Sequence, residues 1–339
     1  MKAGVPLDLE PMEARGVALL PRGADWQYEP KWDGFRCLAF RDGDEIALRS
    51  KSGQPFERYF PEIVERLRDL RATRFVLDGE LIVPAGESLS FDDLLQRIHP
   101  AASRVAKLSR EHPARYMLFD LLGGSEGESL LALPLLRRRP LLEAFARAFV
   151  PDGDGRLALS PAATDPDRAL AWLGASGDTF DGVVAKRLDA PYGAGSRDAM
   201  VKIKRIRSAD CVVAGYRAND AGDAIGSLLL GLYDDAGALD YVGFTSGFSA
   251  AEKRELFERL RHLRSESSFT GRTPGGPSRW NRGKSSLWQP LRPELVLEVA
   301  FDQVTSGRFR HGTRPLRWRP DKAPRACTTA QLGAGATAR

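Results

Sequence analysis

The sequence predicts an α+β fold in two domains, in which a larger mixed domain precedes a small β-barrel of the OB type. Up to residue 204, short strands rich in branched residues alternate with amphipathic helices. Beyond that point, short strands are separated by Gly and Asp turns and interrupted by one helix, which suits a small barrel. A length of 339 residues fits two domains of ordinary size. We expect domains at residues 1–206 and 207–330, a tail at 331–339, and a hinge at 205–209.

In the first domain, residues 1–25 form a proline-containing leader. The strands and helices that follow are predicted from the spacing of apolar residues and from turn residues. One helix begins at Pro61, a residue type favoured in the first turn, and places Ile63 and Leu67 on one face. Another begins after Ser90, a residue type that caps helix N-termini. We expect two strands around a turn within 28–40, further strands at 45–49, 74–83, 115–122, 182–186 and 201–204, and helices at 61–71, 90–98, 137–149 and 167–173.

In the second domain, the expected strands are residues 211–216, 227–233, 239–244, 294–301 and 314–318, and the helix is 250–263. Residues 265–286, rich in Ser, Gly, Pro, Arg and Lys, predict a long loop. Basic residues flank Trp280 in this loop, and they either clamp a DNA backbone or belong to a solvated flexible segment. They are Arg272, Arg279, Arg282 and Lys284.

Composition limits the class of protein. The net charge of +5 and the pI of about 9.2 permit a polyanionic partner without establishing one. The three cysteines are scattered and odd in number, so we expect no disulfide framework or zinc site, and a reducing cytoplasm. We see no signal peptide and no stretch near the ~18–20 apolar residues of a membrane span.

The most informative segment is Lys31-Trp32-Asp33-Gly34, with Glu29 before it and Arg36 after it. Alone it is weak, because a K-x-D-G pattern often arises by chance. It gains weight because further fragments follow in a fixed order. They are Leu77-Asp78-Gly79-Glu80, Phe119-Asp120, Asp181-Gly182-Val183-Val184-Ala185-Lys186, Val201-Lys202-Ile203-Lys204 and Arg317-Trp318-Arg319-Pro320-Asp321-Lys322.

With these six ordered motifs the chain resembles the ATP-dependent DNA ligases, and more closely the short bacterial ligases tied to end joining and repair. The likeness covers residues 10–325. It implies a nucleotidyltransferase (adenylation) domain of antiparallel sheets plus helices, followed by an OB domain. It also implies that ATP and a lysyl-AMP intermediate are used to seal 3′-hydroxyl and 5′-phosphate ends in nicked or broken duplex DNA.

The resemblance makes Lys31 the nucleophile that carries AMP. A lysine amine has a reference pKa of about 10.4, and it attacks phosphorus only when neighbouring cations or a metal lower that value. Lys202 and Lys204 would supply the positive field and phosphate contacts, because residues two apart on a strand share a face. The alternative for this pair is a solvated face of an edge strand.

The family pattern assigns nucleotide contacts to a set of residues on strands. The alternative is that these residues are ordinary surface or core residues. Glu29 would read the adenine amino group, and Phe119 would stack on the adenine. Arg36 would contact the nucleotide sugar, Glu80 would bind the ribose, and Arg49 would contact the reactive phosphate. Lys186 would contact the nucleotide or a phosphate, and Asp33 would lie near the nick or the metal.

The metal candidates are Asp181 and Asp78. Asp78 and Glu80 lie two apart on one strand face, where two acids attract a cation or a sugar hydroxyl. Asp181 departs from the family, which usually has Glu before Gly-Val-Val-Ala-Lys. The shorter aspartate still ligates a hard cation through oxygen, and triphosphate chemistry implies Mg²⁺ or Mn²⁺.

The last motif supplies Arg319, Asp321 and Lys322. In the family the OB domain swings this segment over ATP, where the cations orient the β- and γ-phosphates as pyrophosphate leaves. The domain then rotates away, because DNA needs the same face, and this makes residues 205–209 a hinge. The alternative is a basic strand that binds phosphate passively.

Other functions remain as alternatives. Lysine and carboxylates alone also fit RNA ligases or capping guanylyltransferases, although the Asp181–Arg187 stretch and the Arg-Pro-Asp-Lys ending favour DNA ligases. An NAD-dependent ligase is disfavoured, since the chain has no cysteine-rich metal module and no extra N-terminal domain. A catalytically lapsed nucleic-acid binding module is the alternative of another class. We expect a cytoplasmic, nucleoid-associated monomer, with Ku-like or polymerase repair proteins as candidate partners.

Overall fold

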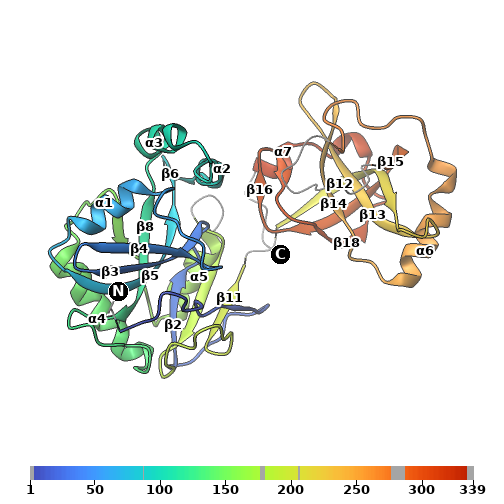
Figure 1. Cartoon of the computed structure of the whole chain (residues 1–339). Coiled ribbons are helices and arrows are strands. Elements are labelled where there is room, and N and C mark those ends of the chain that lie inside the picture. The colour runs from blue at the N-terminus through green and yellow to red at the C-terminus, as the bar shows by residue number, and fades with distance from the viewer. Residues whose placement is uncertain (1–3, 87, 176–179, 205–206, 276–286, 334–339) are drawn as a thin grey trace. The chain divides into compact units, whose positions relative to one another are not determined.

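The computed structural model describes residues 4–86, 88–175, 180–204, 207–275 and 287–333. The chain divides into two compact units, Met1–Arg205 and Ile206–Arg339, and each unit is described by itself (Figure 1). Among the described residues, no helix has the length and apolar character needed to cross a membrane.

The first unit combines two larger sheets and one two-stranded sheet with helices. Its strands are β1 Arg15–Gly16, β2 Trp26–Pro30, β3 Phe35–Asp42, β4 Glu45–Ser50, β5 Arg74–Ile82, β6 Pro84–Ala85, β7 Ser88–Leu89, β8 Arg115–Gly123, β9 Leu157–Leu159, β10 Val183–Arg187 and β11 Met200–Ile203. Its helices are α1 Pro61–Arg68, α2 Phe91–Gln96, α3 Ala102–Glu111, α4 Leu135–Phe149 and α5 Pro166–Ala175.

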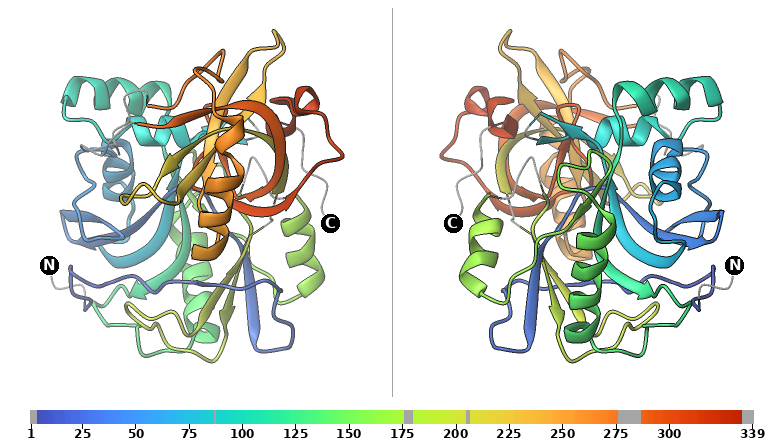
Figure 2. Two further views of the ribbon diagram at one scale, coloured as in Figure 1. Left: turned by 90° about the vertical axis from the view of Figure 1, so that its right-hand side faces the viewer. Right: turned by 90° about the vertical axis from the view of Figure 1, so that its left-hand side faces the viewer.

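The two sheets have the neighbour orders β4-β3-β5-β8-β9 and β1-β11-β10-β2. Most neighbours are antiparallel, while β8–β9 and β1–β11 are parallel. Helix α4 packs along β8 and β9 (Figure 2), α1 contacts β4, and α5 covers β2 and β10. A buried apolar cluster joins strands of both sheets, and its members include Leu38, Phe40, Val76, Leu122 and Met200.

Local sequence explains the helix starts in this unit. Helix α1 has Pro61 in its first turn and buries Ile63 and Leu67, as the period predicts. Helix α2 follows Ser90, whose hydroxyl accepts a hydrogen bond from the Asp93 N–H at 3.1 Å. The sequence analysis did not predict α3. This helix has no side-chain cap, so only its amphipathic pattern could have revealed it.

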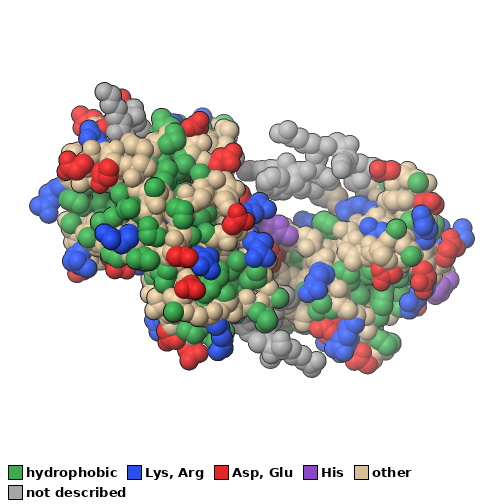
Figure 3. All heavy atoms as spheres, turned by 90° about the horizontal axis from the view of Figure 1, so that it is seen from below, with side chains coloured by type: hydrophobic (Ala, Val, Ile, Leu, Met, Phe, Trp, Pro, Cys, Tyr) green, Lys and Arg blue, Asp and Glu red, His purple; other side chains and the backbone are tan. Residues whose placement is uncertain are grey.

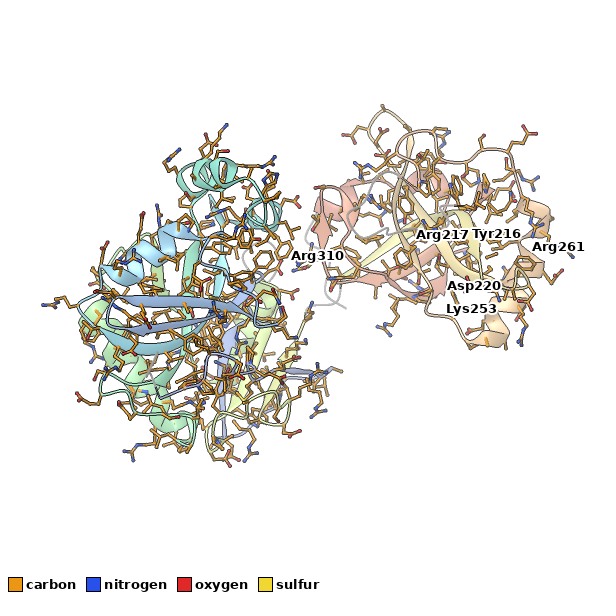
Figure 4. The ribbon with its side chains drawn as sticks, viewed as in Figure 1. Tyr216, Arg217, Asp220, Lys253, Arg261 and Arg310 are labelled. Atoms are coloured by element: carbon orange, nitrogen blue, oxygen red, sulfur yellow. The ribbon has the colours of Figure 1, made fainter. Side chains whose placement is uncertain are left out.

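The second unit is built on one antiparallel sheet with neighbour order β14-β13-β12-β15-β18. Its elements are β12 Arg207–Ala218, β13 Ile225–Tyr233, β14 Leu239–Thr245, α6 Ala250–Arg259, η1 Arg261–Leu263, β15 Gln289–Phe301, β16 Val304–Thr305, β17 Arg308–Phe309, β18 Arg314–Trp318, η2 Pro324–Ala326 and α7 Ala330–Gly333. Tyr216 of β12, labelled in Figure 4, packs edge-to-face against Phe257 of α6 with ring centroids 5.8 Å apart. This contact packs helix α6 against the sheet.

The α+β class is confirmed, with strands and helices mixed in the first unit and strands dominating the second. The predicted helix 250–263 is α6 followed by a 3₁₀ turn. Of the predicted hinge, residues 207–209 belong to β12, while 205 and 206 lie outside the described residues. In the predicted basic loop, Arg279, Trp280, Arg282 and Lys284 also lie outside them.

Charge is mixed over the visible face of both units, with basic and acidic side chains interspersed (Figure 3). Within the described part of the predicted loop, the backbone N–H of Arg272 donates to Asp240 Oδ1 at 2.5 Å, and its Nη1 donates to the Ser306 carbonyl at 3.2 Å. Arg272 is therefore tied to its own unit, which limits how far it can extend toward a DNA backbone.

Candidate active site

A cavity of ≈ 230 Å³ in the first unit is lined by strands of both sheets. The strands place predicted nucleotide residues around it from different parts of the sequence. These are Glu29, Lys31, Arg36, Glu80, Phe119, Lys186 and Lys202. The structure thus brings seven of the predicted residues to one hollow.

Lys31 lies beside Asp181 because the β2–β10 ladder continues past the ends of both strands. The Lys31 N–H donates to the Gly182 carbonyl at 2.9 Å, and the Asp181 N–H donates to the Lys31 carbonyl at 2.7 Å. Gly182 has φ +146°, and a Cβ there would clash with the Ile203 carbonyl, so glycine is required. Lys31 and Asp181 are far apart in the sequence of this unit, and the ladder makes them neighbours.

One carboxylate oxygen of Asp181 forms ion pairs with two lysines. Asp181 Oδ2 lies 2.7 Å from Lys31 Nζ and 2.9 Å from Lys204 Nζ, and the Asp181 side chain is 5% exposed. Lys202 lines the cavity on β11, where burial and then the charges of Lys31 and Lys204 lower its pKa. The site therefore concentrates three ammonium groups, two of them paired with one buried aspartate, which is a field suited to phosphate oxygens.

Asp78 is fully buried and forms a fork with Arg36. Arg36 Nε and Nη2 donate to Asp78 Oδ1 and Oδ2 at 2.5 and 2.6 Å, and Tyr192 donates its hydroxyl hydrogen to Asp78 Oδ2 at 2.7 Å. Arg36 also donates to the Met12 carbonyl, which ties the leader to the sheet. Both Asp78 oxygens accept hydrogen bonds in this arrangement, and the predicted metal role of Asp78 stays a prediction.

Glu29 is the acid at the inner side of the cavity, and it is 2% exposed. Lys186 Nζ approaches its two oxygens at 2.8 and 2.9 Å, and Gln27 Nε2 donates to Oε1 at 2.8 Å. Lys186 Nζ also lies 4.6 Å from the centroid of the Phe119 ring, and Arg36 Cζ lies 4.5 Å from it. Cations thus occupy positions over the ring on which a base is expected to stack.

Glu80 faces the same cavity from β5, directly across the ladder from Arg36 on β3. Burial raises the pKa of Glu80 to about 7, against the opposing effect of Arg36 and Lys31. A carboxyl group that binds its proton near neutral pH can donate or accept a hydrogen bond, which suits contact with a sugar hydroxyl.

Arg49 and Asp33 are predicted residues of this unit that do not line the cavity. Arg49 Nη1 pairs with Glu57 Oε1 at 2.5 Å and lines a neighbouring hollow of ≈ 540 Å³ together with Lys51. Lys51 lines both hollows and pairs with Glu13 at 2.9 Å. Asp33 is half-buried in the turn between β2 and β3. The predicted roles of Arg49 and Asp33 stay predictions.

The last motif forms a charge cluster within the second unit. Arg319 Nη1 lies 2.8 Å from Asp210 Oδ1, Lys322 Nζ lies 2.9 Å from Asp210 Oδ2, and Arg319 Nη2 lies 2.8 Å from Asp321 Oδ2. The hydrogen bond from Arg319 lowers the pKa of Asp321 to about 2. Asp210, on β12, was not a predicted site residue.

Sequence reasoning also missed Gln27, Lys51 and Arg139, which surround the predicted residues. Gln27 had a usable signal, because it lies two residues before Glu29 on the same strand and so shares its face. Lys51 and Arg139 carried no comparable signal. Their positions depend on how a turn and helix α4 pack against the sheets.

The residues fit a divalent cation only in part. The described residues contain no group of three or more His, Cys, Asp or Glu side chains arranged to hold a metal ion. Asp181 is the one predicted ligand with a suitable buried oxygen facing the cations of the site. A metal would therefore need oxygen ligands from the substrate as well, and triphosphate oxygens are of that kind.

Comparisons with known proteins identify the family. Residues 14–204 match the ATP dependent DNA ligase domain, and residues 221–322 match the ATP dependent DNA ligase C terminal region. DNA ligase C1 of Mycolicibacterium smegmatis is 46% identical, with 96% of this chain and 93% of that protein covered.

Two further likenesses are to ligase D proteins. The multifunctional non-homologous end joining DNA repair protein LigD of Mycobacterium tuberculosis is 33% identical, over 94% of this chain and 39% of that protein. The solved structure of a mycobacterial DNA ligase D complexed with ATP and MES is 28% identical, with a TM-score of 0.50. The match covers 98% of this chain and 99% of that chain. The chain belongs to the ATP-dependent DNA ligases, in the bacterial DNA ligase C group that is related to the ligase domain of LigD.

Proposed function

We propose that this ligase seals 3′-hydroxyl and 5′-phosphate ends of duplex DNA through AMP carried on Lys31, and that it acts in DNA repair. The observation that carries the proposal is the placement of Lys31 against Asp181 with Lys202 and Lys204 beside it. A repair role draws support from the likeness to a protein named for non-homologous end joining.

In the first step, the Lys31 amine attacks the α-phosphorus of ATP, a phosphoramidate bond forms, and pyrophosphate leaves. Asp181 holds Lys31 in place, and its carboxylate is positioned to accept the proton that the ammonium group must lose. Lys202 and Lys204 stabilise the negative charge that develops on the α-phosphate. Positioning of these groups before ATP arrives lowers the cost of reaching the transition state.

The nucleotide is held by the remaining residues of the cavity. Glu29 accepts a hydrogen bond from the adenine amino group, Phe119 stacks on the base, and Glu80 contacts the ribose. Arg36 lies near the sugar and Lys186 near phosphate. Arg49 and Asp33 lie outside this group and face the DNA end, where Arg49 contacts the reactive phosphate.

The second and third steps transfer AMP to the 5′-phosphate and release it when the 3′-hydroxyl attacks. A divalent cation, held by Asp181 and substrate oxygens, would neutralise phosphate charge in each of the three steps. We infer that Arg319 and Lys322 orient the β- and γ-phosphates in the first step only, through rotation of residues 207–330 about the 205–209 segment. Ku-like or polymerase repair proteins are candidate partners.

The test is labelling with ATP that carries radioactive α-phosphate, followed by a denaturing gel and a chase with nicked DNA or nicked RNA. The protein is first treated with pyrophosphate to remove any AMP already bound. The unsubstituted ligase should form a labelled band that nicked DNA discharges, and Lys31→Ala should form none. The matched control Lys107→Ala removes an exposed lysine of α3 and should label normally.

Each result has a consequence. A label that survives in Lys31→Ala would remove the assignment of the nucleophile. A band discharged by nicked RNA and not by nicked DNA would contradict the strand preference. Wild-type protein that binds nicked DNA but never labels would favour a lapsed binding module.

A further inference from the structure

A buried arginine nitrogen beside Glu29 has no hydrogen-bond partner among the described residues. Arg139, on α4, is 7% exposed. Its Nε donates to Glu143 Oε1 at 2.7 Å and its Nη2 donates to the Ser160 carbonyl at 2.8 Å. Its Nη1 lies 4.0 Å from Glu29 Oε1 and is left unsatisfied. A buried unpaired donor is costly, so its position needs a reason.

The other partners of Glu29 suggest that reason. Lys186 pairs with both Glu29 oxygens while it also lies over the Phe119 ring. One ammonium group cannot keep these contacts and also reach a phosphate, which is its proposed role. Nucleotide binding therefore requires Lys186 to leave Glu29, and the base requires the space over Phe119.

If Lys186 moves away, the negative charge of Glu29 loses the cation that is paired with it. Glu29 is 2% exposed, and among the residues that the structure describes Gln27 would be the remaining donor within hydrogen-bond distance. A buried carboxylate without a cation tends to take up a proton, and a protonated oxygen no longer accepts a hydrogen bond from an amino group. Base recognition would then fail at the moment when it is needed.

We propose that Arg139 is a positioning residue for base recognition, which closes on Glu29 through Nη1 when the nucleotide draws Lys186 away. The inference rests on the proposed roles of Glu29 and Lys186. Arg139 can do this without losing its other contacts, because the planar guanidinium directs separate N–H groups to Glu143, to Ser160 and toward Glu29. Lysine has no such fork.

The alternative is that Arg139 only ties α4 to the chain at Ser160. Ser160 Oγ also accepts a hydrogen bond from Trp32 Nε1 at 2.9 Å, next to Lys31, so a structural loss could reach the site. A structural loss would weaken the use of every nucleotide alike. A loss of base recognition would instead depend on whether the substrate carries the 6-amino group.

The experiment measures self-adenylylation with ATP and with purine riboside triphosphate, which lacks the 6-amino group, for full-length protein stripped of AMP. The variants are Glu29→Gln, Arg139→Met and Arg139→Lys. The matched control is Arg97→Met, because Arg97 is a fully buried arginine of the same unit that pairs with Glu62 at 2.8 Å. The readouts are kcat and KM for each nucleotide and the melting temperature.

We expect Arg139→Met to raise the KM for ATP by roughly tenfold, the size of one lost hydrogen bond to a charged group. The ratio of kcat/KM for ATP to that for purine riboside triphosphate should fall toward the Glu29→Gln value, and Arg139→Lys should lie between. Arg97→Met should lower the melting temperature and leave the ratio unchanged.

An unchanged ratio in Arg139→Met, with a changed ratio in Glu29→Gln, would overturn the inference while the base-reading role of Glu29 stood. An unchanged ratio in Glu29→Gln would remove that role and the inference with it. If Arg139→Met does not fold, Arg139→Lys decides, since an unchanged ratio there also overturns the inference.

Discussion

Replacing Asp78 by Asn should destabilise the first unit strongly, because it breaks a fully buried ion pair. Asp78 is 0% exposed, and its oxygens lie 2.5 and 2.6 Å from two nitrogens of Arg36. Removing one partner of a buried pair costs about 3–5 kcal/mol, because the other charge stays buried without compensation. The Arg36 side chain is 20% exposed, so water can partly solvate it, and we expect the lower end, about 3 kcal/mol.

Hydrogen exchange read by mass spectrometry is the assay, because it reports each unit separately. Peptides from β3 and β5 should lose protection by roughly a hundredfold, since each ~1.4 kcal/mol is a factor of ten. Peptides from β12 and β13 in the second unit should exchange as in the unsubstituted protein. The control Asp189→Asn breaks an exposed pair with Arg187 whose N···O distance is 2.6 Å.

Loss of protection in β3 and β5 that is no greater in Asp78→Asn than in Asp189→Asn would refute the reasoning. It would mean that burial adds nothing to this pair, and that the Arg36–Asp78 fork is not what anchors Arg36 beside Phe119.

Three further predictions follow from the charges of the site. Burial raises the pKa of Glu80 from 4.5 to about 7, so between these pH values the folded state holds a proton on Glu80 that the unfolded state has lost. As pH rises through that interval, the folded protein should therefore lose stability relative to the Glu80→Gln variant. Urea unfolding at several pH values should show this difference growing to about pH 7 and then staying constant, and a difference independent of pH would contradict it. Lys322→Ala should slow self-adenylylation by about a hundredfold, the usual effect of losing one charge-stabilising group, and should spare sealing of a nick that already carries AMP. Equal loss in both assays would exclude a role limited to the first step. Chelation of divalent cations should abolish labelling by α-phosphate ATP, and Mg²⁺ or Mn²⁺ should restore it, whereas full labelling in chelator would argue against a metal requirement.

The sequence by itself determined the fold class and the family. Strand and helix periods, the proline start of α1 and the Ser90 cap are local properties, so they can be read without knowing the fold. The six motifs could be recognised for the same reason, because each is a short run of adjacent residues. Helix α3 was missed because it lacks a capping side chain and shows only its amphipathic pattern.

Tertiary structure alone decided which charges meet. Lys31 and Asp181 are far apart in sequence, and the β2–β10 ladder joins them. The pairing of Asp78 with Arg36 depends on the register between β3 and β5 and on the orientation of the two side chains.

Arg139 is the clearest case of a residue that the sequence could not assign. Its nitrogen reaches Glu29 because α4 packs against the first sheet while Glu29 lies on the second. Local propensity fixes where strands and helices form, since it depends on neighbouring residues in the chain. Charge pairing depends on distances across packed elements, and those distances exist only once the sheets and helices have assembled.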